Sequence, residues 1–154
     1  MKLYLIQHAK AASKDVDPQR LLTEEGRRDI QKIAEFIKPL NLSLDYLWHS
    51  GKTRAQQTAE ALAKVIDIRK EMSAREGLAP NDNVKVIKDE IDSVKQDIMI
   101  VGHMPFVSKL ASLLLTGSES SGTVAFRQSG IVCLNYSDEN QWQLNWMITP
   151  DLLV

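Results

Sequence analysis

The sequence has no excess of charge of either sign. Its 154 residues contain 19 Lys and Arg against 20 Asp and Glu, which gives a formal net charge of -1. Such a balance creates no overall field that would attract nucleic acid or an anionic membrane. We therefore expect neither as a partner, although a local basic pocket is compatible with any net charge.

Cysteine pairs and long apolar runs are also missing. The one cysteine, Cys133, can form no intrachain disulfide, and its apolar neighbours favour a buried structural thiol. The N-terminal apolar run, Leu3–Ile6, is shorter than the roughly 7–15 apolar residues of a signal peptide. No run is long enough to cross a membrane. These absences predict a cytoplasmic protein.

Length and composition fit one folded domain. The apolar fraction is 44% and the charged fraction 25%, both close to the average of globular proteins. A chain of this size buries roughly 68–70% of its unfolded surface, which is enough for a core of its own. With no linker and no repeat in the sequence, we predict a single domain spanning residues 1–154.

Short apolar runs alternate with amphipathic segments along the chain. The runs without helical periodicity predict buried strands, at residues 3–6, 44–49 and 98–101. Apolar residues at helical spacing predict four helices, one capped by Thr23, one capped by Ser50, one around 84–94 and one after Pro105. Residues 131–136 and 142–148 predict a closing β-hairpin. The pattern indicates an α/β sandwich with a mostly parallel sheet, helices on both faces and an antiparallel edge.

The three histidines, His8, His49 and His103, each stand at the end of a predicted strand. Open α/β sheets bind ligands at the carboxyl ends of their strands. Arg54 lies in the first turns of the second predicted helix, where the helix N-terminus favours anions and a guanidinium binds phosphate oxygens. With Arg20 in the loop after the first strand, this set suits phosphoryl transfer without a metal. A neutral imidazole would attack phosphorus, and cations would stabilise the equatorial oxygens.

Four ordered motifs resemble those of the histidine phosphatase superfamily, which has the phosphoglycerate mutase-like fold. They are Gln7-His8-Ala9, Arg20 before Leu22-Thr23-Glu24-Glu25-Gly26, the block Ser50–Thr58 with its Arg-Ala-Gln-Gln-Thr, and Gly102-His103-Met104-Pro105. Within the superfamily, the short closing hairpin with Trp146 is similar to the small SixA-type phosphohistidine phosphatases. The resemblance extends over essentially the whole chain.

The resemblance implies a role for each matched position. His8 would be phosphorylated transiently, Arg54 and His103 would bind the phosphoryl group, and Arg20 would stand at the edge of the pocket. No cofactor and no metal is implied. His49 matches no catalytic position of the family, and we take it as structural.

Gln7 departs from the family pattern, because an arginine normally precedes the nucleophilic histidine. Hydrogen bonds to charged groups are worth about 1.5–3 kcal/mol and neutral ones about 1 kcal/mol. The difference predicts phosphate handling weakened by about 2- to 30-fold rather than abolished. Lys10 is the nearest further cation. Glu76 is a weak candidate for the general acid that relatives use on alkoxide leaving groups.

The segment between Ile66 and Ile98 is too short to roof a pocket, which favours a phosphate presented on a protein. A phosphorylated histidine carrier or phosphotransfer protein is thus the predicted substrate. Three alternatives stay open: a non-catalytic phosphate-binding or adaptor domain marked by Gln7, a phosphatase of a small phosphorylated metabolite, and a zinc hydrolase using all three histidines.

Overall fold

The computed structural model describes residues 1–154. Its six strands form one sheet in the order β3-β2-β4-β1-β5-β6. Neighbours among β3, β2, β4 and β1 pair in parallel, whereas β5 pairs antiparallel with β1 and with β6. The strands are β1 (Lys2–Gln7), β2 (Ser43–His49), β3 (Asp67–Ala74), β4 (Ile98–Gly102), β5 (Ile131–Tyr136) and β6 (Trp142–Ile148).

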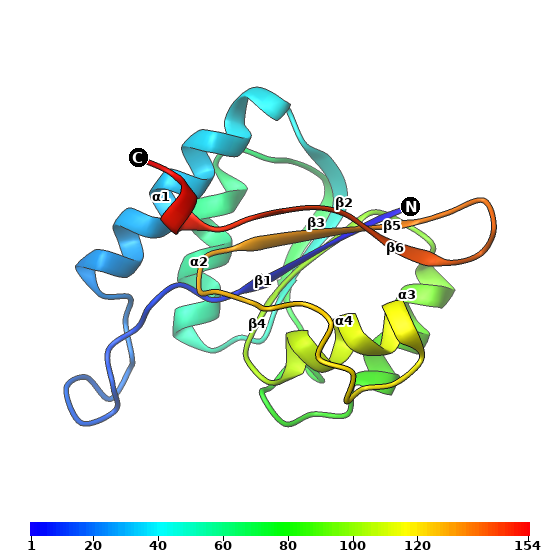
Figure 1. Cartoon of the computed structure of the whole chain (residues 1–154). Helices are drawn as coiled ribbons and strands as arrows, with labels where there is room; N and C mark the ends of the chain where they lie inside the picture. Colours follow the sequence, from blue (N-terminus) through cyan, green and yellow to red (C-terminus); the bar gives the residue numbers. More distant parts are fainter.

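Four α-helices cover the two faces of the sheet (Figure 1). They are α1 (Glu24–Ile37), α2 (Thr53–Ala63), α3 (Val84–Val94) and α4 (Phe106–Thr116). None is long and apolar enough to cross a membrane. The helices pair as α1 with α2 and α3 with α4, so the predicted sandwich, with helices on both faces and a C-terminal antiparallel hairpin, is confirmed.

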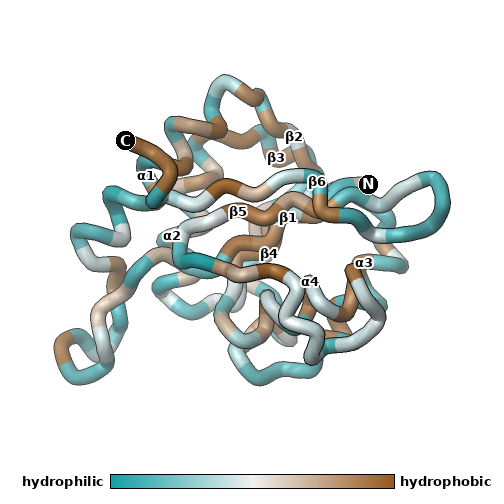
Figure 2. The backbone as a smooth tube through the Cα atoms, in the orientation of Figure 1, coloured by the Kyte–Doolittle hydropathy of each residue, from teal (hydrophilic) through white to brown (hydrophobic).

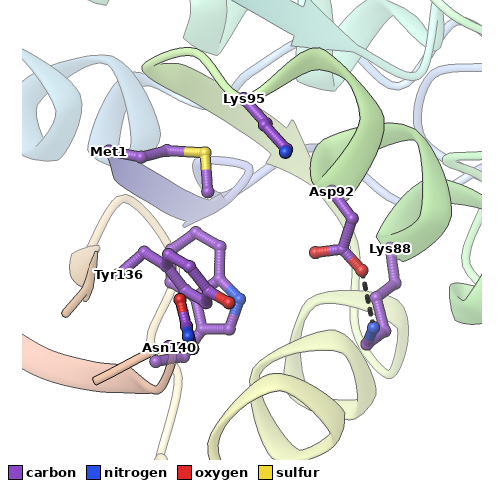
Figure 3. A pocket seen from close by; sticks show the side chains of 7 residues that line it. Met1, Lys88, Asp92, Lys95, Tyr136 and Asn140 are labelled. Carbon is purple, nitrogen blue, oxygen red and sulfur yellow. Dashed lines mark hydrogen bonds and ion pairs between the residues drawn. The ribbon is translucent and has the colours of Figure 1, made fainter. Parts of the chain in front are cut away.

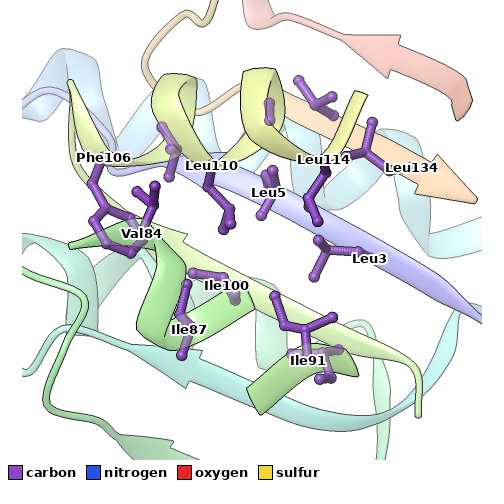
Figure 4. Packing of buried hydrophobic residues seen from close by; sticks show 14 of the residues in the cluster. Leu3, Leu5, Val84, Ile87, Ile91, Ile100, Phe106, Leu110, Leu114 and Leu134 are labelled. Carbon is purple, nitrogen blue, oxygen red and sulfur yellow. The ribbon is translucent and has the colours of Figure 1, made fainter. Parts of the chain in front are cut away.

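The alternation of side chains along β1 divides the core in two. Leu3 and Leu5 pack with residues of α3 and α4, as Figure 4 shows, and Tyr4 and Ile6 pack with residues of α1 and α2. The apolar residues concentrate in the central strands, and the connecting loops are mostly polar (Figure 2). All five residues of β4 are buried, as a central parallel strand covered on both faces requires.

The strand β3 was not predicted from the sequence. Its residues Asp67–Ala74 are mostly exposed and include Arg69, Lys70 and Glu71, which gives them no apolar pattern. The strand forms because its backbone pairs with β2 at the edge of the sheet. Charged side chains are typical of such an edge, since they prevent pairing with a further strand.

The two predicted helix caps had different outcomes. Thr23 caps α1 as predicted, because its hydroxyl oxygen accepts a hydrogen bond from the Gly26 N–H at 3.0 Å. The prediction that Ser50 caps α2 is wrong, because the helix begins at Thr53 with Lys52 in the capping position. The Ser50 hydroxyl instead contacts the His103 ring at the carboxyl edge of the sheet.

Candidate active site

The parallel pairing of β1 with β4 brings two histidines together. Gln7 is paired with Gly102 in the register, and the His8 N–H donates to the Gly102 carbonyl at 2.9 Å. The rings of His8 and His103 lie with their centroids 5.0 Å apart. Both side chains are buried at the carboxyl edge of the sheet, with exposures of 7% for His8 and 2% for His103.

One hydrogen bond determines which nitrogen of the His8 ring carries the hydrogen. Its Nδ1 lies 2.7 Å from the carbonyl oxygen of Ala9. Because a carbonyl oxygen can only accept, Nδ1 must carry the hydrogen, and Nε2 keeps its lone pair. Nε2 is therefore the nitrogen available for attack on an electrophile.

The ring of His103 is held from the other side by Ser50. The Ser50 hydroxyl lies 2.6 Å from Nε2 of His103, and its oxygen accepts from the Lys52 N–H at 3.3 Å. The Nδ1 atom of His103 is buried without a partner. When the serine donates to Nε2, Nδ1 carries a hydrogen that is free to meet an incoming oxygen.

Both imidazoles are neutral at pH 7. Burial lowers the pKa of His8 to about 4, and the charges of Arg54 and Arg20 act in the same direction. Burial likewise lowers the pKa of His103 to about 3, helped by His8, Arg54, Lys52 and Arg20. A neutral ring is the form that a nucleophile needs.

Arg54 is the second residue of α2, and its Nε is buried without a partner. Burial and the charge of Arg20 lower the pKa of this guanidinium. Thr58 links the helix to the segment that carries His8, since its hydroxyl donates to the Arg54 carbonyl and accepts from the Ala9 N–H. A guanidinium with an unsatisfied nitrogen at a helix start is a binding group for an anion.

Two further cations stand near the pair. Arg20 adopts a left-handed backbone conformation with φ 52°, and its Nε donates to the Ala12 carbonyl at 2.9 Å. Lys52 acts on the pKa of His103. Lys52 was missed by the sequence reasoning, although its place between Ser50 and Arg54 in the motif was a usable signal.

Three other candidates, Gln7, Lys10 and Glu76, make no side-chain hydrogen bond to the two rings. Lys10 is paired with Glu25 at 2.6 Å and does not replace the charge that Gln7 lacks. Gln7 ends β1 half-buried, and its carbonyl accepts from the Ser129 N–H. Glu76 is exposed in the turn after β3, and its charge has no part in the pKa shifts of the two histidines.

The geometry does not supply a zinc site made of three histidines. The His49 ring is used within its own turn, where Nδ1 accepts from the Gly51 N–H at 3.1 Å. No group of three or more His, Cys, Asp or Glu side chains is arranged to hold a metal ion. His49 thus stabilises the connection that leads into α2.

Five surface cavities of 300 to 470 Å³ lie elsewhere on the molecule, and none is lined by His8, Arg54 or His103. The cavity of 470 Å³ is at the opposite end of β1, beside Met1, Tyr136 and Trp142 (Figure 3). The histidine pair therefore lines none of these five cavities.

Comparison with known proteins agrees with this geometry. The family model of the histidine phosphatase superfamily (branch 1) matches residues 3–82. A curated relative, phosphohistidine phosphatase SixA of Escherichia coli (strain K12), is 21% identical over 97% of this chain and 94% of its own. With the histidine pair and Arg54 in place, the chain belongs to the histidine phosphatase superfamily.

Solved structures share the fold. The protein histidine phosphatase SixA in complex with tungstate has a TM-score of 0.86 at 20% identity, with 99% of both chains covered. The alpha-ribazole phosphatase from Shigella flexneri has a TM-score of 0.79 at 16% identity, with 97% of both chains covered. The predicted phosphoglycerate mutase-like architecture is thereby confirmed.

Proposed function

We propose that this chain is a phosphatase that hydrolyses protein phosphohistidine through a phosphohistidine intermediate on His8. The decisive observation is the tautomer of His8, whose Nδ1 is held by the Ala9 carbonyl, together with the half-buried Arg54, whose Nε is buried without a partner. A fixed neutral nucleophile beside an unsatisfied cation suits transfer of an anionic group.

The reaction follows from these groups in two steps. Nε2 of His8 attacks phosphorus, the bond from phosphorus to the substrate imidazole breaks, and that imidazole takes up a proton from the solvent. Water then attacks the phosphoryl group, which breaks the bond to His8, releases inorganic phosphate and returns a proton to the solvent. Arg54, Arg20 and Nδ1–H of His103 stabilise the charge on the phosphoryl oxygens, so the proposed reaction requires no metal.

The placement of Glu76 supports phosphohistidine as the substrate. An imidazole leaves more readily than an alkoxide and needs less help from a general acid. In this structure Glu76 is exposed and does not contact the histidine pair. The connection from β3 to α3 spans only residues 75–83, and this shortness supports a phosphate presented on a protein. The partner would be a phosphorylated histidine carrier or phosphotransfer protein, and a cytoplasmic location remains a prediction.

A second candidate is a phosphatase of a small phosphorylated metabolite. The similarity in fold to an alpha-ribazole phosphatase favours it. Specificity constants distinguish the two: kcat/KM should be higher for a phosphorylated histidine carrier domain than for simple phosphate esters. The opposite ranking would favour the metabolite.

The intermediate itself can be trapped. Incubation with a phosphohistidine protein, followed by rapid quenching, should leave an acid-labile phosphate on His8. The label should form equally after exhaustive chelation. A protein that binds the phosphorylated partner but neither takes up label nor releases phosphate would be a non-catalytic adaptor, as Gln7 could suggest.

A further inference from the structure

Three buried side-chain polar atoms in this chain lack a hydrogen-bond partner: Arg54 Nε, His103 Nδ1 and Ser129 Oγ. The first two belong to the candidate active site, where an oxyanion would satisfy them. Unsatisfied buried groups are uncommon in folded proteins, and each requires an explanation. Ser129 is fully buried, and the mechanism so far gives its hydroxyl no role.

The sheet places Ser129 beside the nucleophile. The β1–β5 register ends where Ile6 pairs with Ile131, and just beyond it Gln7 forms an isolated bridge with Gln128. The Ser129 N–H donates to the Gln7 carbonyl at 3.0 Å, so the two segments are in contact there.

The backbone at Ser129 is unfavourable for a serine. Gly130 N–H donates to the Arg127 carbonyl at 3.0 Å, which closes a four-residue turn with Ser129 in its third position. Ser129 has φ 67°, a left-handed conformation that glycine or asparagine usually provides in such a turn. Residues held in this way concentrate at functional sites.

We propose that Ser129 is a further phosphoryl-binding residue, whose hydroxyl donates a hydrogen bond to an oxygen of the phosphoryl group on His8. This inference rests on the proposed function. It places a neutral donor next to Gln7, the position that carries no positive charge. A bound phosphoryl group would then satisfy all three unpartnered atoms at once, since each can donate to an oxygen acceptor.

Two variants test the hydroxyl separately from the backbone. Ser129→Ala removes the hydroxyl and keeps the β-carbon, and Ser129→Gly also relieves the left-handed conformation. Titration calorimetry with tungstate, a phosphate-shaped oxyanion, should show binding weakened about 5- to 10-fold in both, the value of one neutral hydrogen bond. kcat/KM should fall by a similar factor. Thermal unfolding of Ser129→Gly should be unchanged or shifted upward.

Lys95→Gly is the matched control. Lys95 also has a left-handed backbone, with φ 51°, but it ends α3 far from the histidine pair. This variant should gain stability without any change in tungstate affinity.

The outcomes separate this inference from the proposed function. Unchanged tungstate affinity in both serine variants would overturn the role of Ser129 while wild-type turnover left the phosphatase intact. Weakened binding in the glycine variant alone would assign the effect to backbone freedom and would also overturn it. A wild-type chain that bound no tungstate and hydrolysed no phosphohistidine would overturn both.

Discussion

The two ends of the parallel strands differ in whether their charged side chains have partners. At the amino ends, Arg69 donates to Asp45 at 3.0 Å and lies 3.6 Å from Asp97, and Asp97 accepts from the Lys2 N–H at 2.7 Å. At the carboxyl ends, Arg54 has a buried nitrogen without any partner. The Arg69 charge at the amino ends is paired within the chain, whereas the Arg54 Nε at the carboxyl ends has no partner within it.

This contrast separates stability from function on one scaffold. The paired charges at the amino edge hold β2, β3 and β4 in place. At the carboxyl edge, the buried Arg54 Nε and the buried neutral histidines cost stability, because no group of the chain satisfies Arg54 Nε or His103 Nδ1. Substitutions at the amino ends should therefore lower stability and spare activity, whereas those at the carboxyl ends should lower activity and spare stability.

The largest difference is expected from removing the nucleophile. His8→Ala should lower kcat by more than about 10³-fold, because in the proposed mechanism His8 alone accepts the phosphoryl group. Asp45→Asn, at the opposite edge, should lower the melting temperature and leave kcat/KM nearly unchanged. Steady-state turnover and thermal unfolding of both variants measure this. Substantial turnover in His8→Ala would refute the assignment of His8 as nucleophile.

Removal of one arginine from each edge should give the second-largest difference in activity and stability. Arg54→Met should lower kcat/KM by about 10- to 200-fold, the value of a lost charge-assisted hydrogen bond, and should not reduce stability. Arg69→Met should lower the melting temperature and leave kcat/KM unchanged. If Arg54→Met instead destabilised the fold and spared activity, the guanidinium would be a structural group.

Adding a cation at the carboxyl edge should have a smaller effect. Gln7→Arg should raise kcat/KM by about 2- to 30-fold, since one charge-assisted contact replaces a neutral one. The gain should be larger for phosphate esters, whose leaving groups need more stabilisation. Lys70→Gln, on the exposed edge strand, serves as a charge-changing control. Lower activity of Gln7→Arg on every substrate would show that Gln7 has a function of its own.

The smallest expected effect is on the pH dependence of kcat/KM. Because burial lowers the pKa of His8 to about 4, kcat/KM should stay nearly level from pH 7 to about 5. A histidine with an ordinary pKa near 6.5 would lose about tenfold by pH 5.5. Stability should fall over the same range, because the unfolded chain takes up protons below pH 6.5 that folded His8 and His103 resist until about pH 4 and 3. An acid limb at pH 6.5 would contradict the lowered pKa.

Much of the fold could be predicted because it depends on short-range patterns. The apolar runs of β1, β2 and β4 are buried on both faces, and the spacing of apolar residues in α1 requires only a few neighbours to recognise. The hairpin of β5 and β6 follows from its turn. The strand β3 could not be found in this way, because its charged residues have no apolar pattern and its partner strand alone makes it a strand.

By itself, the sequence determined which strands end in histidine and that Arg54 opens a helix, because these features are local. The tertiary structure decided which of those ends meet. The parallel register joined His8 to His103 and left His49 in its own turn, and it turned the Ser50 hydroxyl from the expected cap to the His103 ring. It also paired Lys10 with Glu25, left Glu76 exposed and set Ser129 beside Gln7. Such contacts depend on the register between strands and on burial, which no local pattern of residues encodes.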